Sequence, residues 1–102
     1  MSYHAKSKTY KIKGKVWLYP AMEAWHFVYV GKKESEEIKA KYGKIRRGFG
    51  SIPVLVTIGK TRWETSIFPE KNGPYLLPLK AEVRKREGIR DGDDISFSMK
   101  IR

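Results

Sequence analysis

Hydrophobic and polar residues alternate along several short stretches of this chain, which glycines and prolines separate. Between residues 9 and 20, the side chains of Tyr10, Ile12, Val16 and Leu18 fall on one face of an extended chain, and lysines occupy the opposite face. This period of two predicts a strand with one buried face.

The C-terminal stretch, residues 95–102, alternates most regularly. It predicts that Ile95, Phe97 and Met99 lie in the core while serines face outward. Four further stretches, rich in β-branched and aromatic residues, are predicted strands: 25–31, 52–58, 62–68 and 75–79.

Two segments have helical rather than strand character. Residues 32–44 place apolar side chains at helical spacing, with acidic residues early and lysines late, which matches the helix dipole. Gly43 is placed to end this helix in a left-handed conformation. The second predicted helix is shorter, spans residues 80–87 and ends at Gly88.

Six strands and two short helices, joined by glycine and proline turns, predict a mainly β fold. We expect a small closed six-stranded barrel, because closure removes exposed strand edges. The length suits one domain, residues 1–102, in which residues 1–7 form a flexible N-terminal arm. Residues 25–56 and 75–99 share the order strand, helix, glycine turn, strand, which allows two such units to pair about a pseudo-twofold axis.

The composition changes the picture through its charge. With 22 lysines and arginines against 11 acidic residues, the formal net charge is +11 at pH 7. Such an excess favours polyanionic partners such as nucleic acid, although surface lysines also serve solubility alone. The chain has no cysteine, no apolar run long enough to cross a membrane and no signal-peptide core at its start. We therefore expect a soluble, cytoplasmic, monomeric protein without a membrane partner.

Basic residues gather in three places. Some project from one face of the first strand alongside Trp17, some lie in the glycine-rich stretch after the first helix, and some lie on the second helix. The candidate nucleic-acid or anion-binding residues are Lys11, Lys13, Lys15, Lys44, Arg46, Arg47, Arg84 and Lys85. Basic side chains beside exposed aromatic rings hold phosphates and stack bases. The alternative is that these faces are only solvated, with these aromatic residues in the core: Trp25, Trp63, Phe68, Tyr75 and Phe97.

Residues 44–54, KIRRGFGSIPV, have two interpretations. The glycine spacing partly resembles a P-loop, but Phe49 and Gly50 stand where that loop needs lysine and its successor, and a strand follows instead of a helix. A nucleotide P-loop is therefore excluded. A backbone nest that binds an anion and a simple helix-to-strand connection both remain open.

Catalytic and metal-binding patterns are weak. The two histidines are His4, near the N-terminus, and His26, within an aromatic strand. Asp91, Asp93 and Asp94 lack the glutamate that would complete an EF-hand loop, and they suit a turn better. We expect no catalytic centre, no cofactor and no bound metal.

The sequence resembles a known protein family. The residues that carry the resemblance are the strand IPVLVTIG, then Trp63, Thr65, Ser66 and Pro69 of WETSIFP, then YLLP, VRKREGI and Gly92-Asp93, together with WHFVYV nearer the start. They resemble the bacterial and archaeal family called domain of unknown function 1905, over nearly the whole chain. One departure is VGKK at residues 30–33, where a proline is expected after the valine.

The resemblance implies a six-stranded barrel of the double-split type and no established activity. Residues 77–97 are also similar to the swapped-hairpin unit of AbrB-like regulators and MazE-like antitoxins, which dimerise and bind DNA through basic residues. We expect a non-enzymatic module that binds nucleic acid or another polyanion. The alternative is an antitoxin-like or stress-linked module that binds an unidentified protein, and an enzyme is a third. A contiguous basic patch would favour nucleic acid, and an exposed apolar patch would favour a protein partner.

Overall fold

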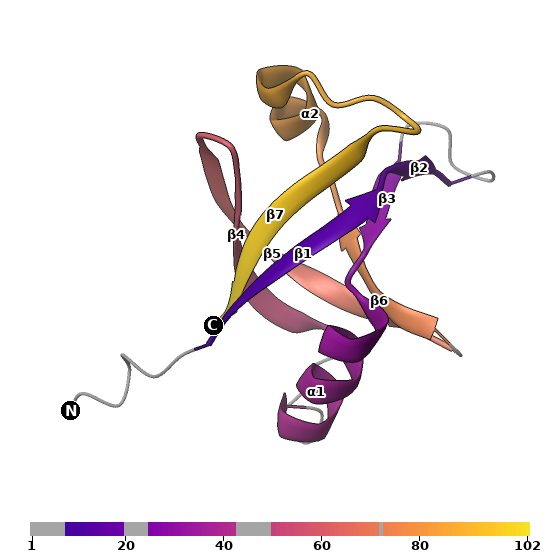
Figure 1. Ribbon diagram of the computed structural model, residues 1–102, viewed down its shortest axis with the longest axis vertical. Helices are drawn as coiled ribbons and strands as arrows, with labels where there is room; N and C mark the ends of the chain where they lie inside the picture. The colour runs from indigo at the N-terminus through magenta and orange to yellow at the C-terminus, as the bar shows by residue number, and fades with distance from the viewer. Residues whose placement is uncertain (1–7, 20–24, 43–49, 72) are drawn as a thin grey trace.

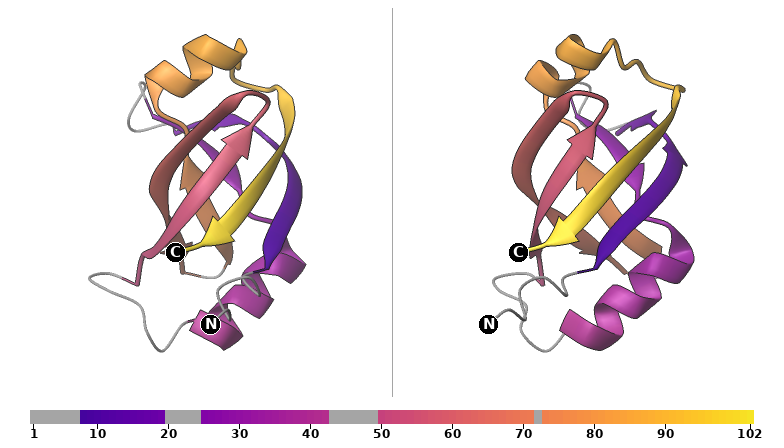
Figure 2. Two further views of the ribbon diagram at one scale, coloured as in Figure 1. Left: turned by 90° about the vertical axis from the view of Figure 1, so that its left-hand side faces the viewer. Right: turned by 60° about the vertical axis from the view of Figure 1, so that its left-hand side comes forward.

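The structure is a computed structural model that describes residues 8–19, 25–42, 50–71 and 73–102. It is mainly β, with two helices at opposite ends of a strongly curled sheet (Figure 1 and Figure 2). The strands are β1 (Thr9–Lys15), β2 (Trp17–Leu18), β3 (His26–Tyr29), β4 (Ile52–Ile58), β5 (Thr61–Glu70), β6 (Gly73–Pro78) and β7 (Asp94–Ile101). The helices are α1 (Lys32–Tyr42) and α2 (Ala81–Glu87).

The seven strands of the described residues form one antiparallel sheet in the order β1-β7-β4-β5-β6-β3-β2. This sheet is a curled half-barrel, so the expectation of a closed six-stranded barrel is wrong. The predicted first strand, residues 9–20, is divided at Val16, because its first part pairs with β7 and its second part pairs with β3. The two edge strands of the sheet are therefore consecutive in the chain.

The two ends of the curled sheet approach each other at Gly14 on β1. A Cβ atom at this position would lie 2.7 Å from Cγ2 of Val28 and 3.2 Å from the carbonyl oxygen of Tyr29, both on β3. Because glycine has no Cβ atom, β1 can pack closely against β3, although the two strands are not neighbours in the sheet.

The strand pairing contains the expected internal repeat. Each strand of the first unit has an equivalent in the second: β3 corresponds to β6 and pairs with it, and β4 corresponds to β7 and pairs with it. In the second unit, β5 lies between β4 and β6. In the first unit, the β1–β2 segment likewise pairs with β7 through β1 and with β3 through β2. The ends of β3 and β6 also repeat one hydrogen bond: the Val30 amide donates to the Tyr75 carbonyl, and the Leu79 amide donates to the His26 carbonyl, each at 2.9 Å. Two units of strand, strand, helix and strand are therefore related by a pseudo-twofold exchange, which places α1 and α2 at opposite ends (Figure 2).

The apolar core lies inside the curl of the sheet, and both helices contribute to it. Ile38 of α1 and Val83 of α2 belong to the same buried cluster as the inward side chains of the strands. On β7, the buried positions of Phe97 and Met99 are confirmed, whereas Ile95 at the start of the strand is only partly buried.

The aromatic residues divide between the two faces of the sheet. Trp63, Tyr75 and Phe97 are buried, as expected. The expectation is wrong for Trp25 and Phe68, whose side chains are 48% and 41% exposed. Both residues alternate with inward-facing residues and therefore point away from the core. Their position in the alternation, rather than the general tendency of large rings to be buried, decides their exposure.

The helix ends follow local chemistry. α2 ends at Gly88, as the sequence predicts, and this glycine has a left-handed φ of 65°. Gly43, the expected end of the first helix, lies outside the described residues. Neither helix in the described part of the chain has the length and apolar character needed to cross a membrane.

Phe97→Ala should lower the free energy of unfolding by about 3–5 kcal/mol, because it removes a large side chain from the centre of the core. Denaturant titration measures the loss. The matched control is Ser96→Ala on the outer face of the same strand, which should change stability by no more than about 0.5 kcal/mol. A loss below about 1 kcal/mol for Phe97→Ala would contradict the placement of the ring.

Candidate nucleic-acid interface

Three lysines occupy the outer face of β1. The inward side chains of Tyr10 and Ile12 are buried in the core, so Lys11, Lys13 and Lys15, here called the lysine stripe, point to solvent. Lys15 forms an ion pair with Asp94 at 3.2 Å.

Lys11 and Lys13 are the uncompensated part of the lysine stripe. They lie opposite Ser98 and Ser96 of β7, which carry no charge. Within the described residues, neither lysine forms an ion pair. Two adjacent outward positions on β1 therefore offer cations that no carboxylate of the described chain neutralises.

The outer face of β2 and β3 is covered by aromatic rings. The aromatic cluster consists of Trp17, Tyr19, Trp25, Phe27 and Tyr29. Neighbouring ring centroids are 5.4–6.0 Å apart, which is the normal range for interacting aromatic pairs. Tyr19, Trp25 and Tyr29 are 37%, 48% and 37% exposed.

The aromatic cluster is a packed layer rather than a set of isolated rings. Phe27 is 8% exposed but does not belong to the main core, and its ring lies against Trp17, Tyr19 and Trp25 on the outer face. The hydroxyl of Tyr29 donates a hydrogen bond to Glu70 at 3.1 Å. Burial, followed by this hydrogen bond, raises the pKa of Tyr29.

The lysine stripe and the aromatic cluster meet along the chain at Val16. Val16 is fully buried, so Lys15 before it and Trp17 after it both point outward. Successive outward side chains of a strand are about 6.8 Å apart. The segment therefore carries three lysines and then two rings on its outward side, with the Lys15–Asp94 ion pair between Lys13 and Trp17 and with the rings of β3 beside its second half. The two groups together are called the basic–aromatic face.

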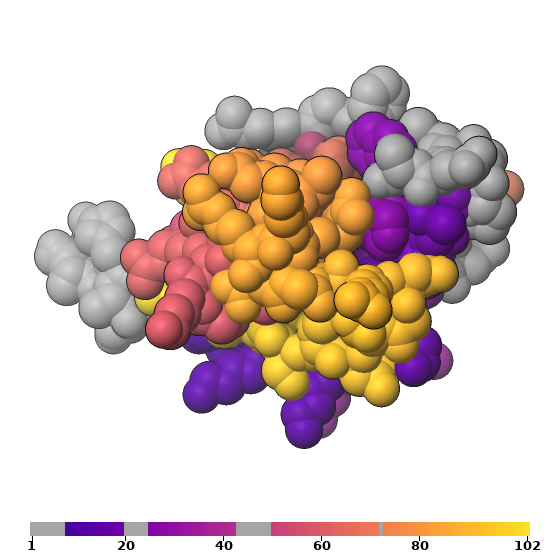
Figure 3. Space-filling view, turned by 90° about the horizontal axis from the view of Figure 1, so that it is seen from above, coloured from indigo at the N-terminus to yellow at the C-terminus, as the bar shows by residue number. Residues whose placement is uncertain are grey.

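The other predicted basic residues do not join this face. Arg84 and Lys85 lie on α2, and the Arg84 Nε donates to the Leu79 carbonyl at 3.0 Å. Seen from the α2 end, side chains of β1 (indigo) project beyond β7 (yellow), away from α2 (orange) (Figure 3). Three further predicted residues lie outside the described residues: Lys44, Arg46 and Arg47.

Two cavities lie outside the basic–aromatic face or at its border. One of about 780 Å³ lies between α1 and the β5–β6 hairpin, and its lining mixes lysines with glutamates. The other, of about 220 Å³, lies between Trp25 and Trp63 and also touches His26, Glu64 and Lys80. Among the described residues, no three histidine or acidic side chains gather as metal ligands would.

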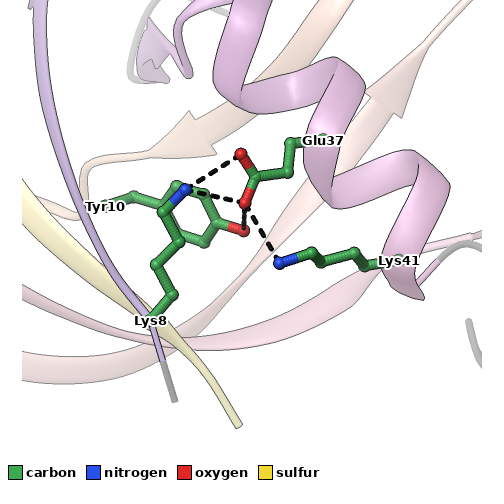
Figure 4. Close-up of polar contacts among 4 residues, drawn as sticks. All are labelled: Lys8, Tyr10, Glu37 and Lys41. Carbon is green, nitrogen blue, oxygen red and sulfur yellow. Dashed lines mark hydrogen bonds and ion pairs between the residues drawn. The ribbon is translucent and has the colours of Figure 1, made fainter. Parts of the chain in front are cut away.

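The strongest pKa shifts belong to a cluster that holds α1 against β1 (Figure 4). Glu37 on α1 accepts hydrogen bonds from Lys8 at 2.8 Å and from the Tyr10 hydroxyl at 3.0 Å, and it forms an ion pair with Lys41 at 3.4 Å. The hydrogen bonds from Lys8 and Tyr10 lower the pKa of Glu37 to about 2. Burial, followed by the carboxylate, raises the pKa of Tyr10.

This cluster links α1 to β1 and to Lys8 before it. The second unit contains a similar contact, in which Thr61 at the start of β5 donates to Glu87 of α2 at 2.6 Å. In both units, a helix carboxylate accepts a hydrogen bond from a hydroxyl near the start of the unit's first strand. The repetition indicates that these contacts dock the helices.

Sequence reasoning found the lysine stripe and missed most of the aromatic cluster. It assigned Trp25 to the core and gave no role to Tyr19, Phe27 or Tyr29. The sequence does show that Trp25, Phe27 and Tyr29 are two residues apart, which places all three rings on the same face of a strand. The sequence does not show which face is buried, because His26 and Val28 on the other face are also compatible with burial.

Residues 13–99 match the model of the family described as domain of unknown function 1905. The chain belongs to this family. The match covers most of the chain and confirms the resemblance, but it does not extend to the AbrB-like and MazE-like likeness, which stays a prediction. Comparison with curated proteins gives no match.

Glu37→Gln should make stability less dependent on pH in acid. The pKa of Glu37 falls from 4.5 to about 2 on folding, so its contribution is present above about pH 4.5 and is lost as the pH falls toward 2. The variant should therefore be less stable than the wild type near neutral pH, with a difference that shrinks on acidification. Thermal unfolding across this pH range measures it.

Glu36→Gln is the control, because Glu36 is an exposed neighbour on the same helix. It should leave the acid part of the profile parallel to that of the wild type. A stability gap for Glu37→Gln that stays constant from neutral pH to about pH 2 would contradict the docking role of the charged carboxylate.

Proposed function

We propose that this protein is a non-enzymatic module that binds nucleic acid through the basic–aromatic face. The observation that carries the proposal is that Lys11, Lys13 and two rings of the aromatic cluster occupy the outward side of one chain segment, with the Lys15–Asp94 ion pair between them. Nucleic-acid phosphates bind lysine side chains, and the bases stack on aromatic rings. Nucleic acid therefore matches both the lysines and the rings of the face.

The charge of the face supports a polyanion. Lys11 and Lys13 have uncharged partners across the sheet, so a phosphate can approach them without displacing an ion pair of the described residues. The chain as a whole has a formal net charge of +11, which draws polyanions toward it over a longer range. Association should therefore be fast and strongly dependent on salt.

One copy of the chain is sufficient for this role. The whole face is built by β1, β2 and β3 of the first unit, so the proposal is of a monomer. It places the protein in the cytoplasm, in contact with cellular nucleic acid. It assigns no catalytic step to the face.

A protein-interaction module is the second candidate. Tyr19, Trp25 and Tyr29 form an exposed apolar patch of the kind that protein partners cover. Such a partner would use the rings and leave the lysine stripe at the rim, where charges mainly affect association rates. Binding would then depend weakly on Lys11 and Lys13 at equilibrium.

The double variant Lys11→Ala, Lys13→Ala should weaken binding to a mixed-sequence oligonucleotide. It should also reduce the slope of log K against log salt by about 1.4 on single strands, since each phosphate contact contributes about 0.7. Fluorescence anisotropy at several salt concentrations measures both effects. The fold should be retained, because exposed lysines contribute little to stability.

The matched control removes two exposed lysines elsewhere: Lys60 on the β4–β5 turn and Lys85 on α2. It has the same net charge as the test variant, so a general effect of charge would appear equally in both. Equal affinity and equal salt slope for the two double variants would exclude the lysine stripe as the site.

A further inference from the structure

We propose that the aromatic cluster stacks unpaired bases, so that the protein selects single strands over duplexes. This inference rests on the proposed function and specifies its ligand class. It requires open ring faces, a rigid arrangement of the rings, and cations placed where the backbone of a stacked strand can reach them.

Open ring faces are present at two positions of the cluster. Trp25 stacks on Phe27 with a 27° angle between ring planes, and Trp25 is still 48% exposed. Tyr29 stacks on Trp17 at 26° and is 37% exposed. In each pair the outer ring contacts its neighbour and still has more than a third of its surface exposed.

The rings are held in place before any ligand binds. Phe27 is buried at the centre of the cluster, and Trp17 contacts Tyr19, Phe27 and Tyr29. The Tyr29 hydroxyl is fixed by Glu70 on β5. Binding therefore orders few side chains that were not already ordered, which lowers its entropic cost.

The lysine stripe favours a nucleic-acid strand over an apolar protein segment as the ligand of this surface. An apolar protein segment would cover the rings but would leave Lys11 and Lys13 without partners of opposite charge. A nucleic-acid strand that runs along β1 and β2 places phosphates beside these lysines and bases beside Trp17, Tyr19 and the rings of β3. Charge and ring chemistry agree only for the second occupant.

The preference for single strands follows from access to the base faces. In a duplex, each base is stacked between its neighbours, and its faces are closed to side chains. In a single strand, the bases can turn onto the rings, and every base has a π face to offer. The lysine stripe contacts phosphates of either form, so only the aromatic cluster distinguishes them.

The test measures the affinity of the full chain for an oligothymidine strand and for a blunt duplex of similar length. The wild type should bind the strand more tightly, and the strand alone should quench tryptophan fluorescence. Trp25→Ala should weaken strand binding by about 5- to 100-fold, as the loss of one stacked base does, and should leave duplex binding unchanged.

Two further variants separate stacking from apolar contact. Trp25→Phe keeps a ring and should retain most of the affinity for the strand. Trp25→Leu keeps apolar bulk without a π face and should behave like Trp25→Ala. Because the Trp25 side chain is half exposed and outside the main core, all three variants should unfold at similar denaturant concentrations. Tyr19→Ala removes a second exposed ring and should also weaken binding to the strand.

The outcomes distinguish this inference from the proposed function. Equal binding of strand and duplex, reduced by Lys11→Ala with Lys13→Ala but not by loss of either ring, overturns the stacking inference and leaves the proposed function standing. Full affinity of Trp25→Leu for the strand also overturns stacking. Absence of binding to both nucleic acids overturns the proposed function itself.

Discussion

The burial of Val16 fixes the arrangement on which the rest of the molecule depends. Its amide donates to the Asp93 carbonyl and its carbonyl accepts from the Gly92 amide, each at 2.8 Å, while its side chain is fully buried. This one residue ends the pairing of β1 with β7 and begins the segment that pairs with β3. By setting the phase on both sides, it also directs Lys15 and Trp17 to the same outer surface.

Much of the fold follows from local alternation, but the pairing of strands does not. The phase of β7 correctly predicted Phe97 and Met99 in the core, because a period of two assigns a face to each residue. The division of the first strand at Val16 depends on which strands lie beside it, and local sequence contains no such information. The lysine stripe was predictable for the same reason as the core. Trp25 was wrongly assigned to the core because both faces of its segment carry apolar or aromatic residues. The residue types therefore did not show which face is inward.

The two units share a fold without sharing a surface. Outward positions of β3 carry aromatic rings, whereas the corresponding outward positions of β6 carry Pro74, Leu76 and Pro78. The inner faces of both strands are buried in one core and must satisfy the same packing constraint. The outer faces have no such constraint. The internal repeat therefore preserves the architecture, while the basic–aromatic face belongs to the first unit.

The pairing of β1 with β7 has a consequence for the order in which the molecule forms. Thr9 lies opposite Lys100, so the first strand of the described residues finds its neighbour only in the last described strand. During synthesis, the inward side chains of β1 have no partner on β7 until that strand has left the ribosome. Contacts this distant along the chain slow folding and favour a transition in which the whole sheet assembles at once. The basic–aromatic face is therefore expected to form only when β7 pairs with β1, as a late product of folding.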